Sequence, residues 1–143
     1  MIDKELIKNK INFIQKELDR LGGFKDLSFE EIISDYFKHT VVERILERII
    51  NDAIDINQHI IAELKESGVP NDYKETFEEL VNLKVFDKDF AMDVSQSVGL
   101  RNILVHNYRK LDEKLFYKSI KSCLSDYTKY CDYILKFIKK NGN

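Results

Sequence analysis

The chain has 143 residues, a length that suits one domain with its own hydrophobic core. It is rich in Lys, Glu, Leu and Ile and has only five Gly and one Pro, a composition typical of helical proteins. The net charge of −2 excludes attraction to nucleic acid or membranes through a global positive field. Any RNA binding must therefore depend on a local feature of the surface.

The amino-terminal segment shows no sign of export, because residues 1–10 are charged and amphipathic rather than uniformly apolar. No apolar run approaches the roughly 18–20 residues that span a bilayer, so we expect a cytoplasmic protein with no membrane partner.

Cys123 and Cys131 lie in a segment with helical periodicity, which separates them by about 12 Å along the helix axis. That separation exceeds the roughly 7 Å limit for a disulfide, and reduced, structural thiols are expected.

Hydrophobic periodicity predicts a first helix over residues 3–21, ended by Gly22-Gly23, since Gly readily takes the left-handed conformation past a helix end. Ser28-Phe29-Glu30-Glu31 has the form of a capping box and predicts a short helix to about residue 37. Thr40-Val41-Val42-Glu43 repeats this signal, and a wide apolar stripe predicts that the central helix runs from there to residue 66. Residues 68–71 are expected to form a loop, because Pro70 cannot continue a helix.

In the second half of the chain, helices are predicted over residues 73–83 and 112–140. Between them Asp87 is expected to cap another helix, which Gly99 would loosen or break. The apolar residues that define the predicted helix faces include Leu6, Phe13, Val41, Phe90, Met92, Val94, Val98 and Leu115. With no strand signal, the prediction is an all-α, antiparallel helical bundle that forms a single domain over residues 1–143.

One stretch carries side chains that could take part in catalysis, and it contains Arg101, Asn102, His106 and Tyr108. Arginine is permanently charged and can hold a phosphate with two parallel hydrogen bonds. Histidine titrates near neutrality and can therefore take and give a proton at cellular pH. A ribonuclease without a metal needs both, because a proton must leave the 2′-hydroxyl or reach the 5′-oxygen while a cation stabilises the phosphorane.

On one straight helix Arg101 and His106 do not share a face, because five residues turn the chain so that they lie roughly 140° apart. Asn102 and His106, four positions apart, do share a face. Three apolar residues are expected on the core side, namely Leu100, Ile103 and Leu104. Either the helix bends near Gly99, or a second subunit completes the site.

The pattern Arg-x₄-His-x-Tyr within residues 99–108 resembles the signature of HEPN-domain ribonucleases, specifically the HepT-like toxin family. The long central helix adds to the likeness, because Val42-Glu43-Arg44, Asp55 and His59 resemble that family's central helix. The later helices follow in the same order, so the resemblance covers nearly the whole chain. Leu100 departs from the family, which tends to carry an aromatic residue there, but the polar residues are intact.

The resemblance implies a HEPN-like four-helix core with short extra helices, and a homodimer whose two motifs line a shared cleft. It implies a toxin of a toxin–antitoxin pair that cleaves tRNA or mRNA without a metal or other cofactor. Arg101 would hold the phosphate, His106 would move protons, and Asn102 would position the backbone or the histidine. The antitoxin would be a minimal nucleotidyltransferase that transfers AMP to Tyr108, whose added bulk and negative charge would exclude RNA.

Other polar residues have both a functional and a structural interpretation. Asp55 and His59 could orient each other or support the cleft, and the alternative is a solvated pair. His39 is expected to be incidental, and metal binding by these scattered histidines is not expected. A basic stripe follows the motif and is either a solvated helix face or a surface that steers RNA; it comprises Lys110, Lys114, Lys118 and Lys121.

Two further functions compete with the nuclease. The protein could be a non-catalytic dimeric partner of a nucleotidyltransferase that presents Tyr108 for modification. It could also be a helical dimerisation scaffold, in which Arg101 is a surface ion-pair former and His106 a helix-end histidine without a chemical role. RNA cleavage and modification of Tyr108 are the observations that separate these functions.

Overall fold

The computed structural model describes residues 1–106 and 108–141, with only the backbone of residue 108. Over these ranges it contains helices and no strand, which confirms the all-α prediction. No described helix is long and apolar enough to cross a membrane. The helices are α1 (Lys4–Gly22), α2 (Phe29–Ile33), α3 (Tyr36–Leu64), α4 (Tyr73–Asn82), α5 (Lys88–His106), the 3₁₀ turn η1 (Tyr108–Lys110) and α6 (Glu113–Asn141).

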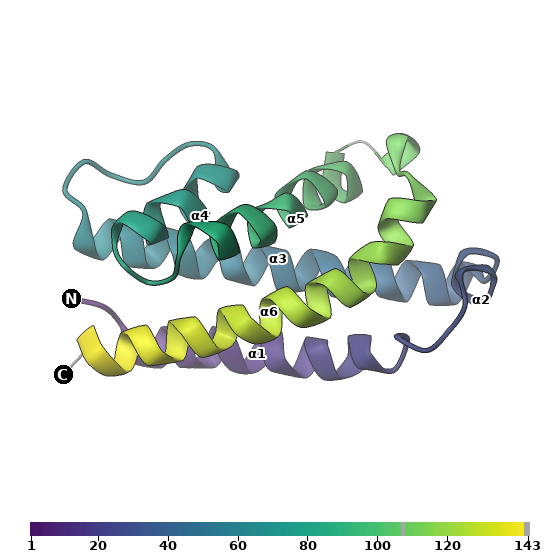
Figure 1. The fold of residues 1–143 in the computed structure, drawn as a ribbon, viewed down its shortest axis with the longest axis horizontal. Coiled ribbons are helices and arrows are strands. Elements are labelled where there is room, and N and C mark those ends of the chain that lie inside the picture. The colour runs from purple at the N-terminus through teal and green to yellow at the C-terminus, as the bar shows by residue number, and fades with distance from the viewer. Residues whose placement is uncertain (107, 142–143) are drawn as a thin grey trace.

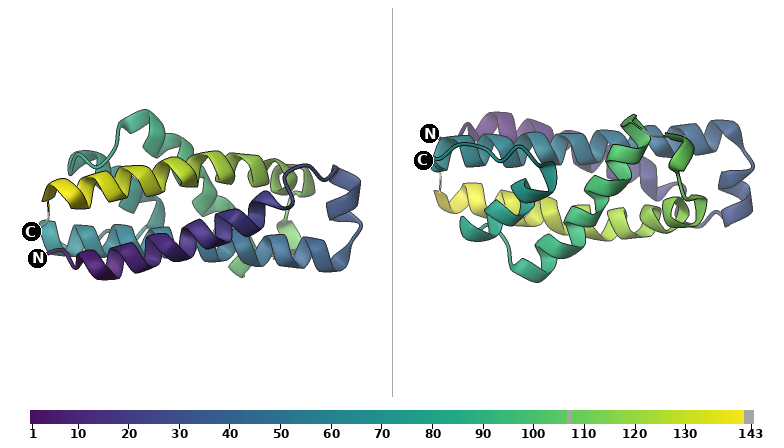
Figure 2. Two further views of the ribbon diagram at one scale, coloured as in Figure 1. Left: turned by 90° about the horizontal axis from the view of Figure 1, so that it is seen from below. Right: turned by 90° about the horizontal axis from the view of Figure 1, so that it is seen from above.

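Four helices, α1, α3, α5 and α6, form the core of an antiparallel bundle (Figure 1). Each of them runs opposite to its two neighbours, since α1 contacts α3 and α6, and α5 contacts the same pair. The short helix α4 packs on α3 and α5, whereas α2 lies at the far end of the bundle against α3 and α6 (Figure 2). The predicted architecture of a four-helix core with short extra helices is confirmed.

Capping side chains determine where several helices begin. The Ser28 capping box is confirmed, with the Ser28 hydroxyl accepting from the Glu31 N–H and the Glu31 carboxylate accepting from the Ser28 N–H. The predicted start of α3 at Thr40 is wrong, because Asp35 caps this helix by accepting from the N–H groups of Phe37 and Lys38. As a result α3 begins at Tyr36 and α2 ends at Ile33.

The glycines behave differently from the prediction. Gly99 does not interrupt α5, which runs without a break from Lys88 to His106. A glycine inside a helix costs only about 1 kcal/mol, less than the burial of the neighbouring apolar residues contributes. The end of α1 at Gly22 is confirmed, but Gly23 keeps a right-handed φ of −65° instead of the expected left-handed conformation. The left-handed glycine is Gly68, with φ of +89°, in the loop predicted from Pro70.

The core draws side chains from every α-helix, and it includes Phe90, Val94 and Val98 as predicted. Several apolar residues expected on inward faces are exposed instead, because each follows or precedes a buried residue by one position and one step turns about 100° away. These are Leu6, Phe13, Val41, Met92 and Leu115.

Both cysteines are buried and free, as expected, and burial raises the pKa of the Cys123 and Cys131 thiols to about 12.

A buried polar network joins three helices inside this core. The Tyr130 hydroxyl on α6 donates to the Asn57 Oδ1 on α3 at 2.6 Å and lies 3.0 Å from the Ala53 carbonyl oxygen. Asn57 Nδ2 in turn donates to the Thr76 Oγ1 on α4 at 3.1 Å. Buried polar groups are costly when they lose a partner, so this network specifies how α3, α4 and α6 pack together.

Replacing Tyr130 with Phe is expected to lower the free energy of unfolding by about 1–3 kcal/mol, because it leaves the buried Asn57 amide oxygen without its donor. Urea unfolding of wild type and Tyr130→Phe measures this loss. Tyr133→Phe is the matched control, since its hydroxyl donates at 3.2 Å to the exposed Asp87 carboxylate, which water can satisfy instead. Equal effects of the two substitutions would contradict the role given to the network.

Candidate functional site

Arg101, Asn102 and His106 lie on the last two turns of α5, beyond the part of this helix that is buried in the core. Asp87 starts the helix, with its carboxylate accepting from the Phe90 N–H at 2.7 Å. Leu100 and Leu104 are only partly buried and pack against the edge of the core. The fully packed part of α5 is earlier, at Phe90, Ala91, Val94, Ser95 and Val98. The motif is therefore held at the rim of the bundle, where a large ligand has access.

Arg101 is held by three different parts of the chain. Its Nε donates to the Asn51 Oδ1 on α3 at 2.8 Å, and its Nη1 donates to the Asn102 Oδ1 at 3.1 Å. Its Cζ lies 5.0 Å from the centre of the ring of Tyr73, and Tyr73 is the first residue of α4. These contacts orient the guanidinium group and leave it half-buried.

The partners of Arg101 are neutral, and within the described ranges it forms no ion pair. The interpretation of Arg101 as a surface ion-pair former is therefore wrong for this part of the chain. A fixed guanidinium group that keeps its full charge can stabilise an anion that forms beside it.

His106 differs from the other two histidines in having no hydrogen-bond partner among the described residues. His39 is buried, with its Nδ1 3.0 Å from the Glu43 carboxylate, and its ring stacks on Phe116. His59 Nε2 accepts from the Asp3 backbone N–H at 3.1 Å. His106 is exposed at the end of α5, so its ring is accessible for proton transfer.

These contacts also decide the roles of the other polar residues. His39 is a packed core residue rather than an incidental one, and its stacking on Phe116 fixes the start of α3 against α6. Asp55 pairs with Lys10, whose Nζ lies 3.3 Å from its carboxylate, and not with His59. Asp55 and His59 therefore do not orient each other or form a pair, and each has a structural contact of its own.

Because α5 is continuous, five helical positions separate Arg101 from His106, roughly 140° around the axis. The contacts of Arg101 direct its guanidinium group toward α3 and α4, whereas His106 is exposed at the helix end. Gly99 does not interrupt the helix between its start and His106. A site assembled with a second subunit is the remaining hypothesis.

The candidate site includes two residues that the sequence did not indicate, Asn51 and Tyr73. Asn51 is 50 positions away from Arg101 and lies in the middle of α3. Neither residue belongs to a recognisable spacing pattern, so their contacts with Arg101 depend on how α3, α4 and α5 pack together. Asn102 was expected to position the backbone or His106. In the structure its amide oxygen instead accepts a hydrogen bond from Arg101 Nη1.

The segment after α5 carries the remaining predicted residues. Tyr108 begins η1, and its side chain lies outside the described residues, as does the whole of Asn107. Lys110 ends η1 and Lys114 lies in the first turn of α6, and both are exposed. Within the described ranges, no group of three or more His, Cys, Asp or Glu side chains could hold a metal ion.

The comparisons with known proteins cover nearly the whole chain. The Ribonuclease HepT-like family matches residues 14–134, a range that contains the motif. The chain is 32% identical to the tRNA nuclease HepT of Aphanizomenon flos-aquae over 137 residues, which are 96% of this chain and 92% of that protein. It is 27% identical to the mRNA nuclease HepT of Shewanella oneidensis over 131 residues, with coverage of 91% and 96%.

A solved structure has the same fold. The tri-AMPylated HEPN toxin of Shewanella oneidensis in complex with MNT antitoxin matches with a TM-score of 0.81 at 27% identity. The match covers 95% of this chain and 99% of that one. Sequence and fold therefore point to the same relatives, over the same helices that position Arg101 and His106.

Proposed function

Since the chain belongs to the Ribonuclease HepT-like family, we propose that it is a toxin that cleaves RNA with Arg101 and His106. The observation that carries the proposal is the pair itself, a guanidinium group fixed by neutral partners and an accessible histidine on the same two helical turns. The two curated relatives, a tRNA nuclease and an mRNA nuclease, support RNA as the substrate.

The proposed reaction is an internal transfer of the phosphodiester. The 2′-oxygen attacks phosphorus as its proton leaves, and the bond from phosphorus to the 5′-oxygen breaks as that oxygen gains a proton. His106 takes or gives one of these protons. Arg101 stabilises the extra negative charge of the phosphorane. Asn102 positions Arg101 through the bond from Nη1 to its amide oxygen. The products carry a 2′,3′-cyclic phosphate and a 5′-hydroxyl.

The chain is proposed to act as a homodimer. Exposed apolar side chains lie at the starts of α3 and α6 and at the end of α5: Tyr36, Phe37, Val41, Val105 and Leu115. The stacking of His39 on Phe116 places the starts of α3 and α6 side by side. Exposed apolar side chains favour a protein interface, and a second copy bound there would also supply a second motif.

The test is incubation of purified wild-type protein with tRNA and mRNA in excess EDTA, with the ends of the products mapped. Cleavage that leaves a 2′,3′-cyclic phosphate, and that stops when the cleaved position carries a 2′-deoxyribose, is the expected result. No cleavage of either RNA by the wild-type protein would contradict the nuclease proposal. It would favour the second function, a non-catalytic dimeric partner that is modified by a nucleotidyltransferase.

Tyr108 is proposed as the acceptor of AMP from a minimal nucleotidyltransferase antitoxin, supported by the tri-AMPylated relative in its complex. Co-expression with such an enzyme is expected to add AMP-sized increments to the intact mass and to abolish cleavage. Tyr108→Phe should show neither effect and should still cleave RNA. Increments that persist in Tyr108→Phe would assign the modification to another residue.

A further inference from the structure

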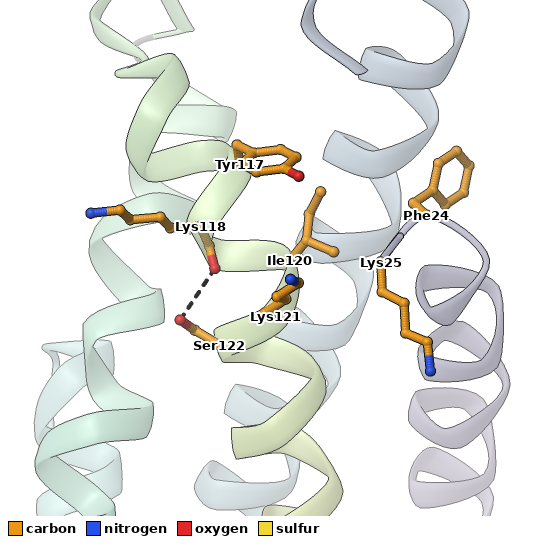
Figure 3. Close-up of a pocket in the computed structure, with 7 residues that line it drawn as sticks. All are labelled: Phe24, Lys25, Tyr117, Lys118, Ile120, Lys121 and Ser122. Atoms are coloured by element: carbon orange, nitrogen blue, oxygen red, sulfur yellow. Dashed lines mark hydrogen bonds between the residues drawn. The ribbon is translucent and has the colours of Figure 1, made fainter. Parts of the chain in front are cut away.

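A groove lies between α6 and the loop that follows α1, and its lining includes none of the motif residues. It consists of two adjoining hollows of about 360 and 540 Å³, which share Lys25 and Lys121 as lining residues. Figure 3 shows Lys25 on the loop across from Tyr117, Ile120 and Lys121 on α6, with the Lys118 side chain pointing away from Lys25 on the other side of that helix.

The charge of this groove is strongly positive, although the whole chain has a net charge of −2. Lys25, Lys118 and Lys121 line the first hollow, and Lys129 adds to the second, where Asp26 is the one acidic lining residue. Within the described ranges none of these four lysines forms an ion pair, whereas Lys10, Lys38 and Lys65 elsewhere each do. Lys129 interacts electrostatically with Asp126, whereas Lys25, Lys118 and Lys121 have no carboxylate partner among the described residues and are available to bind an external anion.

The floor and walls of the groove are held by contacts within the chain. Ile120 is buried, and the Tyr117 hydroxyl donates to the Leu27 carbonyl oxygen at 2.6 Å, which ties α6 to the loop. The Tyr117 ring also packs edge-on against Phe29 of α2. The Ser122 hydroxyl donates to the Lys118 carbonyl oxygen, as the dashed line in Figure 3 marks. The polar groups that remain for a ligand are mainly the lysine ammonium groups.

The lysines also form a row that is too long for a single small anion. Lys114, Lys118, Lys121 and Lys129 lie within an arc of about 80° on α6 and extend over about 22 Å of its length. The row begins directly after η1, next to the end of α5 that carries the motif. A chain of phosphates is the ligand that matches a row of separate cations.

We propose that this groove binds the sugar–phosphate backbone of the RNA that flanks the cleaved bond. The inference rests on the proposed nuclease function and adds to it a second RNA-binding surface, centred on Lys25 and Lys121. Lysine ammonium groups on flexible stems bind phosphates without reading bases, so this surface contributes affinity and direction along the strand.

The test measures binding of a tRNA transcript to the non-cleaving His106→Ala protein, with and without Lys25→Gln/Lys121→Gln. The double substitution is expected to weaken binding roughly tenfold or more and to reduce the slope of log K against log salt by about 1–2. Lys139→Gln/Lys140→Gln at the far end of α6 is the matched control, with the same change of charge on exposed residues. It should leave both quantities unchanged.

Two results would overturn the inference: unchanged tRNA binding in the Lys25→Gln/Lys121→Gln protein, or an equal loss in the control. If tRNA binding is unchanged and a parallel measurement shows weaker antitoxin binding, the groove is assigned to an acidic protein surface. A dinucleotide substrate, too short to reach the groove, separates this inference from the nuclease proposal. The groove variant in the active protein should cleave the dinucleotide like wild type and cleave tRNA more slowly.

Discussion

Replacing His106 with Ala is expected to reduce RNA cleavage by about 10²–10⁴-fold, the usual contribution of general acid–base catalysis. His106 is exposed and has no hydrogen-bond partner among the described residues, so its removal should leave the fold and the unfolding free energy unchanged. The measurement is the single-turnover rate of tRNA cleavage in EDTA, together with urea unfolding of the same preparation.

His59→Ala is the matched control for this experiment. Its ring accepts a hydrogen bond from the Asp3 backbone N–H and lies on α3, away from the motif. Cleavage by this variant should be close to that of wild type, even if the protein is slightly less stable. Wild-type activity in His106→Ala would exclude this histidine from catalysis, and a loss of activity in both variants would indicate a structural effect.

Replacing Arg101 with Lys is expected to reduce the rate by at least about 10², although the positive charge is kept. Lysine has no planar group to stack on Tyr73 and no equivalent of the Nε that donates to Asn51. Its ammonium group would therefore not be held where the phosphorane forms. The rate constant of cleavage should fall more than the affinity for RNA, because a charge–phosphate contact survives.

Asn51 provides a separate test of the same geometry. Asn51→Ala removes the acceptor 2.8 Å from Nε and leaves Arg101 itself intact. It should lower the cleavage rate by about tenfold, in the range expected when one charge-assisted hydrogen bond of about 1.5 kcal/mol is lost. An unchanged rate in Asn51→Ala would show that this contact does not position the guanidinium group.

Mixing the two inactive variants tests the shared cleft. If Arg101 of one protomer acts with His106 of the other, a heterodimer of Arg101→Ala and His106→Ala has one complete site. Activity should then appear after subunit exchange. In a fully exchanged equimolar mixture half of the dimers are heterodimers, so the count of intact sites gives about a quarter of the wild-type activity. No activity in the exchanged mixture would place both residues in one protomer's own site, or would exclude the dimer.

The sequence alone was sufficient for the features that depend on neighbouring residues. Helix periodicity, the Ser28 capping box, the Asp87 cap and the loop at Pro70 involve residues within about four positions of one another, and all are present. The spacing of Arg101 and His106 also predicted their divergence on one helix, which the uninterrupted α5 retains.

Errors occurred where two local signals competed. Thr40 and Asp35 could both cap α3, and only the structure shows that the Asp35 carboxylate accepts hydrogen bonds from two backbone N–H groups. Gly99 weakens a helix by its own propensity, but the packing of α5 on α3 and α6 outweighs that preference. Exposed apolar residues such as Phe13 could not be assigned either, since one helical step separates an inward position from an outward one.

The tertiary structure alone decided what surrounds the motif. Asn51 and Tyr73 reach Arg101 because α3 and α4 pack against α5, and Lys25 faces Lys121 because α1 packs against α6. These residues are tens of positions apart in the sequence, where no periodic pattern links them. Local sequence determined the helices and the chemical groups of the motif, whereas long-range packing of apolar faces determined which groups meet.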